Sequence, residues 1–306
     1  MKFMENTKIN FMKFKSLGFG LSSLLAFGSL VLLLMGVNLG IDFKGGTAIG
    51  VNFTEEVSIQ EIRSSLKSVS INEKLIDLSG EEIKYFGSQS DVMIKIKSLD
   101  NEPENFGQIV INHLYESMSA KVPENKNDFI LSLGSVSPKV GSELSGKAFW
   151  SVVSALVLIL FYISVRFEFR FALGAILALV HDVVITLGIF SLTGFEITLS
   201  TVAAFLTIVG YSLNDTIVIL DRIRENMKSS GTVMFESTIN KSINQSLSRT
   251  LITSLTTLFV IIVLLIYGGE VLRPFSFTML VGVIIGTYSS IYIASALLAT
   301  IYQSSK

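Results

Sequence analysis

The chain has 306 residues, of which 50% are hydrophobic and 16% are charged, and its formal net charge is −1. Soluble globular proteins carry about 25% charged residues, so this composition predicts an integral membrane protein; the near-zero charge excludes the basic balance of a nucleic-acid-binding protein. Cysteine is absent and only two histidines occur, which excludes disulfides, thiolate chemistry and a histidine-rich metal site. We therefore expect no metal, no cofactor and no catalytic residue.

The first apolar stretch, residues 17–37, is long enough to cross a bilayer, which takes about 20 apolar residues. It follows a short tail, residues 1–16, that contains Lys2, Lys8, Lys13 and Lys15. This stretch is longer than the apolar core of a signal peptide, and no A-x-A cleavage site follows it. We expect residues 17–37 to remain as the first transmembrane helix.

Residues 40–147 are polar, carry both signs of charge, and are predicted to form a domain outside the membrane. Their apolar periodicity predicts, in order, a strand, a helix, two strands, a helix and a strand, at 47–53, 58–68, 83–86, 91–97, 104–119 and 129–136. This order is the split βαβ pattern of ferredoxin-like α+β domains. A sheet edge in such a domain can bind extended polypeptide; a structural platform that contacts a partner is an equally good interpretation.

The end of this domain contains the spacing of a phosphate-binding loop, Gly141, Gly146 and Lys147. The next residue is Ala148, whereas such a loop needs Ser or Thr there as a magnesium ligand. We therefore expect no nucleotide site, and we interpret residues 137–147 as a flexible hinge.

Residues 149–301 contain five further apolar stretches, which brings the number of predicted transmembrane helices to six: 149–165, 171–192, 197–220, 251–267 and 275–301, followed by a tail at 302–306. Basic residues concentrate in the first tail and in the loops at 166–170 and 221–250. The positive-inside rule therefore predicts that both termini are cytoplasmic.

Small and hydroxyl residues in these stretches predict how the helices pack. The pairs Gly282/Gly286 and Gly36/Gly40 have the spacing that lets membrane helices approach closely. We expect most hydroxyl groups of spans four to six to bond between helices; they are Ser200, Thr201, Thr207, Ser212, Thr253, Ser254, Thr256 and Thr257.

Asp215 stands in an otherwise uncharged part of the fourth span, between Asn214 and a threonine. A charged aspartate at the centre of a membrane helix costs about 2.5–3.5 kcal/mol, and such residues often lie on ion pathways. Arg249 opens the fifth span from the same side and is the natural counter-charge. Protonation removes most of the burial cost of Asp215, so its charge state is expected to couple to helix packing. A permanent salt bridge between the two residues is the alternative.

Three further ionisable residues are candidates for accessory roles. His181 and Asp182 lie in the middle of the third span, either as a buried polar pair that fixes packing or as part of a proton route. Asp42 follows the first span, where Gly45 and Gly46 favour a simple turn.

Four stretches carry a resemblance to a known family: GIDFKGGT at 40–47, TVAAFLTIVGYSLNDTIVILDRIREN at 201–226, NQSLSRTLITSLTT at 244–257 and GTYSSIYIAS at 286–295. With its six spans and one large loop, the chain resembles the SecF branch of the SecD/SecF family, in the resistance-nodulation-division superfamily. The segment SPKVGSELSGKAFW matches that family more loosely.

The resemblance implies a function in bacterial protein export. SecF-like proteins act in the inner membrane with SecD, beside the SecYEG channel, while ATP hydrolysis belongs to SecA. They are thought to use the H⁺ or Na⁺ gradient to promote translocation of polypeptides. The family's intramembrane acid falls on Asp215 and its arginine on Arg249. The rival interpretations are one half of a small-molecule or lipid exporter of the same superfamily and a non-transporting scaffold subunit.

Overall fold

The computed structural model describes residues 7–71, 74–99, 102–230 and 235–303, so Lys2 and parts of both expected tails lie outside the described residues. The chain divides into two compact units. The membrane unit comprises residues 1–38 and 150–306, and the domain unit comprises residues 39–149.

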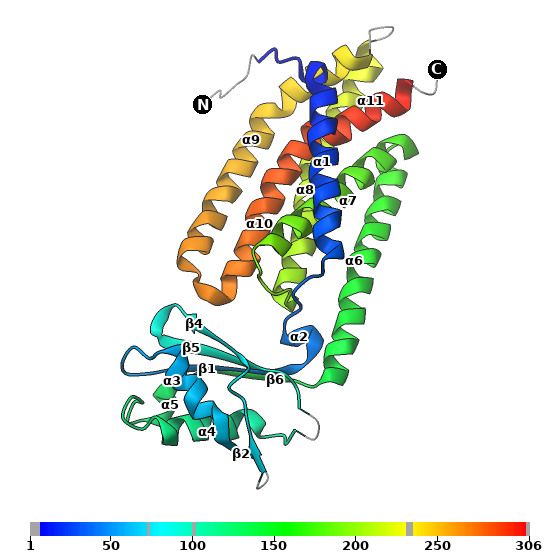
Figure 1. The fold of residues 1–306 in the computed structure, drawn as a ribbon. Coiled ribbons are helices and arrows are strands. Elements are labelled where there is room, and N and C mark those ends of the chain that lie inside the picture. The colour runs from blue at the N-terminus through cyan, green and yellow to red at the C-terminus, as the bar shows by residue number, and fades with distance from the viewer. Residues whose placement is uncertain (1–6, 72–73, 100–101, 231–234, 304–306) are drawn as a thin grey trace. The chain divides into compact units, whose positions relative to one another are not determined.

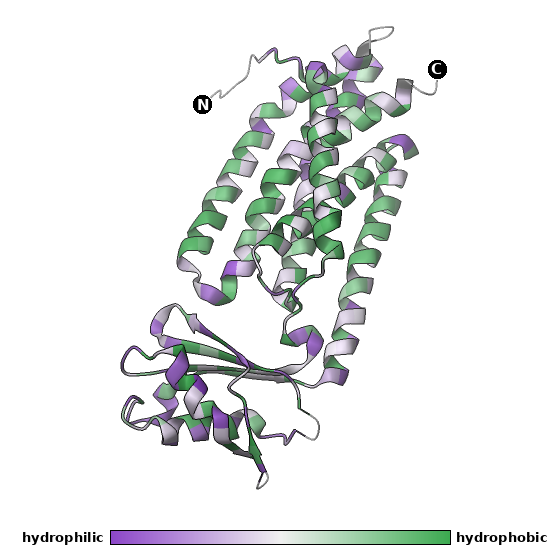
Figure 2. Cartoon of the chain, viewed as in Figure 1, coloured by the Kyte–Doolittle hydropathy of each residue, from purple (hydrophilic) through white to green (hydrophobic). Residues whose placement is uncertain are grey.

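The described residues contain six helices that are long and apolar enough to cross a membrane, which confirms the predicted number (Figures 1 and 2). They are α1 (Lys15–Leu34, after the short turn η1, Phe11–Phe14), α6 (Pro138–Arg166), α7 (Phe169–Leu192), α8 (Leu199–Ser230), α9 (Phe235–Tyr267) and α10 (Gly269–Ser289), which continues through a π-helical turn, η3 (Ser290–Ala294), into α11 (Ser295–Gln303). Helices α8 and α9 reach well beyond the apolar stretches at 197–220 and 251–267, because their polar turns continue the same helices.

The basic segments meet at one end of the membrane unit. The backbone N–H of Ile9 donates to Asn244 Oδ1 at 3.0 Å, and Lys15 pairs with Glu236 at 2.5 Å. The hydroxyl of Tyr302 donates to Glu168 at 2.9 Å. The N-terminal segment, the start of α7, the start of α9 and the end of α11 therefore lie together, as an even number of spans requires.

Glycines bring α8 and α10 into close contact, as the sequence predicts. A Cβ added at Gly282 would lie 2.3 Å from Ile208, and one at Gly286 would lie 3.0 Å from Ser212. The same prediction is wrong for Gly36, which has a φ of 103° just after the end of α1 and meets nothing within 4 Å. Its role is the left-handed turn that ends a helix.

The prediction that most hydroxyl groups of the last three spans bond between helices is also wrong. Ser212 and Ser254 do so. The other hydroxyls bond locally: four donate to carbonyls three or four residues earlier in their own helices, and two bond near the start of α8. They are Thr207, Thr253, Thr256, Thr257, Ser200 and Thr201. This local bonding satisfies a hydroxyl without a partner helix.

The domain unit contains a four-stranded antiparallel sheet of β1 (Gly46–Asn52), β4 (Glu82–Phe86), β5 (Ser88–Ile96) and β6 (Ile130–Val136), in the order β4-β5-β1-β6. The helices α3 (Ile59–Ser65) and α4 (Phe106–Ser117) lie between these strands in the chain. The first and third sheet strands are neighbours in the centre, as in ferredoxin-like domains, which agrees with the predicted α+β fold.

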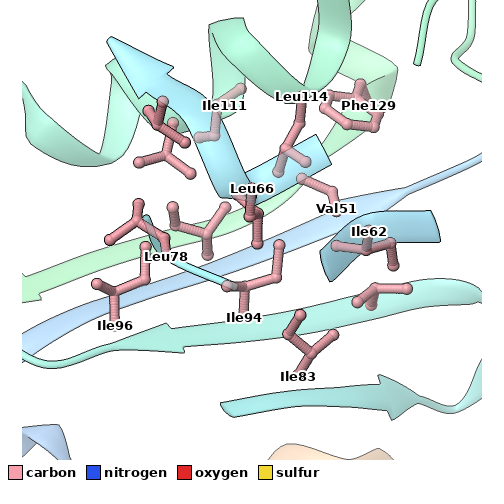
Figure 3. Packing of buried hydrophobic residues seen from close by; sticks show 14 of the residues in the cluster. Val51, Ile62, Leu66, Leu78, Ile83, Ile94, Ile96, Ile111, Leu114 and Phe129 are labelled. Atoms are coloured by element: carbon pink, nitrogen blue, oxygen red, sulfur yellow. The ribbon is translucent and has the colours of Figure 1, made fainter. Parts of the chain in front are cut away.

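The core of this domain lies between the sheet and its helices (Figure 3). Val92, Ile94 and Ile96 of β5 are each at most 1% exposed, which confirms the predicted alternation along this strand. They pack in one cluster with Ile62 of α3 and Leu114 of α4. Each such side chain contributes about 1.5–3 kcal/mol when fully buried.

Four short helices and strands of the domain unit were not predicted. They are α2 (Ile41–Lys44), β2 (Val69–Ile71), β3 (Lys74–Ile76) and α5 (Lys126–Phe129). Elements of three or four residues show too little periodicity to be recognised in a sequence.

The flexible hinge predicted at residues 137–147 is wrong, because α6 starts at Pro138 and continues without a break to Arg166. Proline is well suited to the first position of a helix, and Ser137 Oγ caps the new helix by accepting from Val140 N at 3.4 Å. The Gly141–Lys147 spacing therefore lies in helical turns and not in a phosphate-binding loop.

Gly46→Ala is expected to destabilise the domain, because Gly46 has a φ of 133° and an added Cβ would lie 2.5 Å from the carbonyl oxygen of Ile96. Strained backbone of this kind costs about 1–3 kcal/mol before the clash is counted. Gly134→Ala is the control, since a Cβ at this β6 position meets nothing within 4 Å. Protease resistance of the purified full chain at rising temperature measures both variants, and equal resistance would contradict the prediction.

Candidate functional site

Asp215 lies inside the membrane unit, and its residue is only 3% exposed. Ser254 Oγ of α9 donates to Asp215 Oδ2 across a long 3.4 Å, and the same hydroxyl lies 2.7 Å from Thr287 Oγ1 of α10. Side chains of Asp215, Ser254 and Thr287 therefore link α8, α9 and α10. One long hydrogen bond is weak compensation for a charged carboxylate.

Arg249 lies five residues before Ser254 on α9, and its side chain is exposed in the isolated chain. It is close enough to act electrostatically on the Asp215 carboxylate. Among the ion pairs of the described residues, however, none within 4.0 Å joins Arg249 to Asp215. The close salt bridge considered from the sequence is not formed in this structure, so Arg249 acts on the acid from a distance.

Two other polar atoms are buried near Asp215 along the same helices. The hydroxyl of Tyr211 lies one turn earlier on α8, and that of Thr250 lies one turn before Ser254 on α9. Both are buried and have no hydrogen-bond partner among the described residues. Buried groups of this kind are rare and often mark functional positions. Two buried hydroxyls without partners therefore lie on the same two helices as Asp215 and Ser254.

Asn214 points away from this interior, because its side chain is exposed. Ala203, Thr207, Gly210 and Asn214 are all exposed and recur every three or four residues, so they form one face of α8. Other exposed helix faces carry large apolar side chains, such as Leu24, Phe161 and Phe259, which are 64–69% exposed. Small and polar residues are typical of helix–helix contacts in membranes, whereas large apolar ones suit lipid.

His181 and Asp182 form a second buried polar cluster. Asp182 is 0% exposed, and its Oδ1 lies 2.9 Å from His181 Nδ1. Its Oδ2 accepts hydrogen bonds from Ser212 Oγ of α8 at 2.5 Å and Ser289 Oγ of α10 at 2.8 Å. This pair therefore connects α7 to α8 and α10, as the packing interpretation requires.

The remaining candidate, Asp42, lies in the domain unit, in the first turn of α2. The structure therefore has a short helix where the sequence suggested a simple turn. Within the described ranges, no group of three His, Asp or Glu side chains is arranged to hold a metal ion.

Besides Tyr211 and Thr250, sequence reasoning missed two further hydroxyl residues of this region. Ser289 contacts Asp182, and Thr287 contacts the serine that bonds Asp215. Both belong to the stretch GTYSSIYIAS, which resembles the family. The sequence alone gives no role for the hydroxyl groups of this stretch. Only the fold shows that this stretch faces two acids on other helices.

Comparison with protein-family models gives two matches. The model described as protein export membrane protein SecD/SecF, C-terminal, matches residues 116–304. The model described as SecD/SecF GG motif matches residues 31–57.

Curated relatives named protein translocase subunit SecF match nearly the whole chain. The relative from Calditerrivibrio nitroreducens is 43% identical over 299 residues, which cover 96% of this chain and 94% of that protein. The relative from Rhodothermus marinus is 42% identical over 302 residues, with the same coverage. The relative from Escherichia coli O157:H7 is 40% identical over 289 residues, covering 94% of this chain and 86% of that protein.

Among the solved structures that are similar to the chain are two of SecDF. SecDF from Thermus thermophilus, described as a translocon-associated membrane protein, matches with a TM-score of 0.82 and 36% identity. SecDF in a super-membrane-facing form matches with a TM-score of 0.70 at the same identity. These matches cover 99% and 98% of this chain but only 40% and 39% of the SecDF chains, so the chain spans less than half the length of those proteins.

Proposed function

We propose that this chain, which belongs to the SecD/SecF family of protein export membrane proteins, converts an ion gradient into movement of the exported polypeptide. Its role in Sec-dependent export is accessory. In this proposal it acts in the bacterial inner membrane with SecD, after SecA has driven insertion through SecYEG. Asp215 takes up and releases the coupling ion, and Arg249 stabilises the charged acid.

The observation that carries the proposal is a buried carboxylate that has no cation within 4.0 Å among the described residues. Asp215 is 3% exposed and has one long hydrogen bond. The cost of a charged aspartate at such a position, about 2.5–3.5 kcal/mol, disappears when the acid is protonated. One elementary charge crossing 100 mV releases about 2.3 kcal/mol. Because the two energies are similar, the membrane potential is able to change the charge state of the acid.

The surfaces of the membrane unit support a SecD partner. The small, polar face of α8 that includes Asn214 suits contact with another membrane helix better than contact with lipid. The similar SecDF chains are more than twice as long as this chain, so more than half of each lies outside the part that matches it. We place the α8 face against SecD, which puts the partner one helix width from Asp215.

The orientation follows from the basic end of the membrane unit. Lys8, Lys13, Lys15 and Arg249 belong to segments that meet at this end or continue from it. Short basic segments stay in the cytoplasm. The domain unit then lies outside, where the emerging polypeptide is, and its sheet edges β4 and β6 are available for strand addition.

The proposal is tested with inverted membrane vesicles that contain this chain, SecD, SecYEG and SecA, and a substrate halted midway by removing ATP. We expect an imposed gradient to advance the substrate, an uncoupler to stop it, and vesicles without this chain to show no advance. Exchange of Na⁺ for K⁺ distinguishes the two ions. If the gradient does not advance the substrate in complete vesicles, the scaffold interpretation replaces this one. Gradient-driven efflux of a small molecule without substrate advance would indicate an exporter.

A further inference from the structure

We propose that Asp182, together with His181, is a second proton-binding site of the membrane unit, mechanically linked to the first site through α8 and α10. The link rests on the proposed role of Asp215, whereas proton binding at Asp182 does not. Nothing in the ion-coupling proposal above uses this second acid.

The cluster is built as a site and not only as a packing contact. The carboxylate of Asp182 meets three side chains from three helices: His181 on its own helix, Ser212 on α8 and Ser289 on α10. The other ring nitrogen of His181, Nε2, is buried and has no hydrogen-bond partner among the described residues. A structural pair needs no such unsatisfied atom, whereas a group that exchanges a proton needs a free position.

The two serines make a change of charge state inexpensive. In the charged state both hydroxyls donate to Oδ2 of Asp182. When Oδ2 takes up a proton, one hydroxyl accepts from it and turns its own hydrogen to the carbonyl four residues earlier in its helix. These carbonyls belong to Ile208 for Ser212 and to Ile285 for Ser289, and such local bonds are common for serine in helices. Neither Oδ2 of Asp182 nor either serine hydroxyl is left without a partner in either state.

The same two helices carry the partners of the first acid. Ser212 and Asp215 are three residues apart on α8, about 4.5 Å along its axis. Thr287 and Ser289 are two residues apart on α10; Thr287 contacts the serine bonded to Asp215, and Ser289 contacts Asp182. A change in charge at one acid therefore acts on the helices that hold the other.

The backbone beside Ser289 is suited to a shift. The π-helical turn Ser290–Ala294 follows directly, and Ser295 Oγ donates to Ser290 O at 3.0 Å, five residues earlier. Such π turns interrupt the regular ladder and occur frequently at functional sites. Sliding of α10 at this turn would move Ser289 relative to Asp182.

Among the titratable groups of the described residues, only His181 contacts Asp182 directly. The helices packed against α7 carry other titratable or charged groups farther away: Lys15 on α1; Tyr211, Asp215, Asp221, Arg222, Arg224, Glu225 and Lys228 on α8; Glu270, Arg273 and Tyr288 on α10; Tyr292 on η3; and Tyr302 on α11. The direct partners of the Asp182 carboxylate are therefore its histidine and the two serines.

A proton fits this cluster better than a metal cation. The cluster offers four oxygen atoms, two of the carboxylate and two of the serines, and the serines already donate to the carboxylate. Hard cations take six or more oxygen ligands in most protein sites. The remaining neighbour of the carboxylate is a ring nitrogen of His181, whereas hard cations take oxygen ligands.

The proposal is tested by infrared difference spectroscopy of the complex with SecD, in membranes, as the pH is changed. We expect a pH-dependent carboxyl band that disappears in Asp182→Asn and remains in Asp215→Asn. Thr186→Val is the matched control, because this buried threonine lies one turn along α7 and contacts neither acid through a hydrogen bond. His181→Gln keeps a donor beside the carboxyl and should shift the midpoint of the band by about one pH unit.

The same variants are then measured for gradient-driven substrate advance. We expect at least a tenfold loss in Asp182→Asn and wild-type rates in Thr186→Val. A merely structural role of His181 would lower the rate at every pH, whereas the proposed role moves the pH profile of the rate. Absence of any band that depends on Asp182 would overturn the proposal. If substrate advance depended on Asp215 but not on Asp182, the link between the two sites would be refuted while the proposed function stood. If both variants advanced substrate normally, the infrared band would still show whether Asp182 binds a proton.

Discussion

Asp215→Asn is expected to abolish the gradient-driven part of export and to leave insertion of the chain intact. Asparagine has nearly the same shape as aspartate and keeps an oxygen that accepts from Ser254, but it neither binds nor releases a proton. Insertion becomes easier, because the cost of about 2.5–3.5 kcal/mol for a charged aspartate is removed. The same energy corresponds to a factor of about a hundred in an equilibrium constant, and this is the switching energy that the variant loses.

Asp221→Asn is the matched control for this prediction. It is the same substitution on the same helix, six residues later, where the side chain is 41% exposed and lies 3.9 Å from Arg166. Exposed ion pairs contribute about 0–1 kcal/mol, so we expect nearly wild-type export. Asp215→Glu tests position instead of charge, and partial activity is expected from it.

The measurement compares substrate advance after ATP removal with and without an uncoupler, at equal amounts of inserted protein. A variant Asp215→Asn that still advances substrate under a gradient, and stops when the uncoupler is added, would show that another group carries the ion. Equal loss in Asp221→Asn would show that α8 is sensitive to any change of charge.

The sequence was most informative where its periodicity was long. Apolar stretches of about 20 residues identified the six helices of the described residues that are able to cross a membrane, and the alternation of Val92, Ile94 and Ile96 identified a central strand. It failed at residues 137–147, where glycines suggested a hinge and the structure has the start of α6. Helix capping by Ser137 and the proline at the first position outweigh the low helix propensity of Gly141 and Gly146 there.

The candidate site divides in the same way. A lone acid in an apolar stretch is visible in a sequence, because its cost does not depend on its neighbours. Its hydroxyl partners are not visible, because Ser212 and Ser289 become neighbours of Asp182 only when α8 and α10 pack against α7. The hydroxyls of Thr253 and Thr257 look identical in the sequence but bond within their own helix.

Arg249→Gln is expected to reduce gradient-driven export by about tenfold or more, because Asp215 then loses the positive charge that stabilises its ionised form. At an effective dielectric constant of about 20, two charges 4 Å apart attract by about 4 kcal/mol. Arg249 acts on Asp215 from beyond the 4.0 Å of an ion pair, so a smaller part of this energy is lost. Arg249→Lys retains the charge and should retain part of the activity.

The combination of both substitutions decides whether Arg249 works through Asp215. If the two residues act as a unit, Asp215→Asn with Arg249→Gln is no worse than Asp215→Asn alone, because nothing is left for the arginine to stabilise. Arg222→Gln is the control: this exposed arginine pairs with Glu225 at 2.7 Å on the same helix, and its loss should have little effect. If the two defects multiply in the double variant, Arg249 does not act through Asp215. Arg249 would then be assigned to a contact with the partner, since its side chain is exposed in the isolated chain.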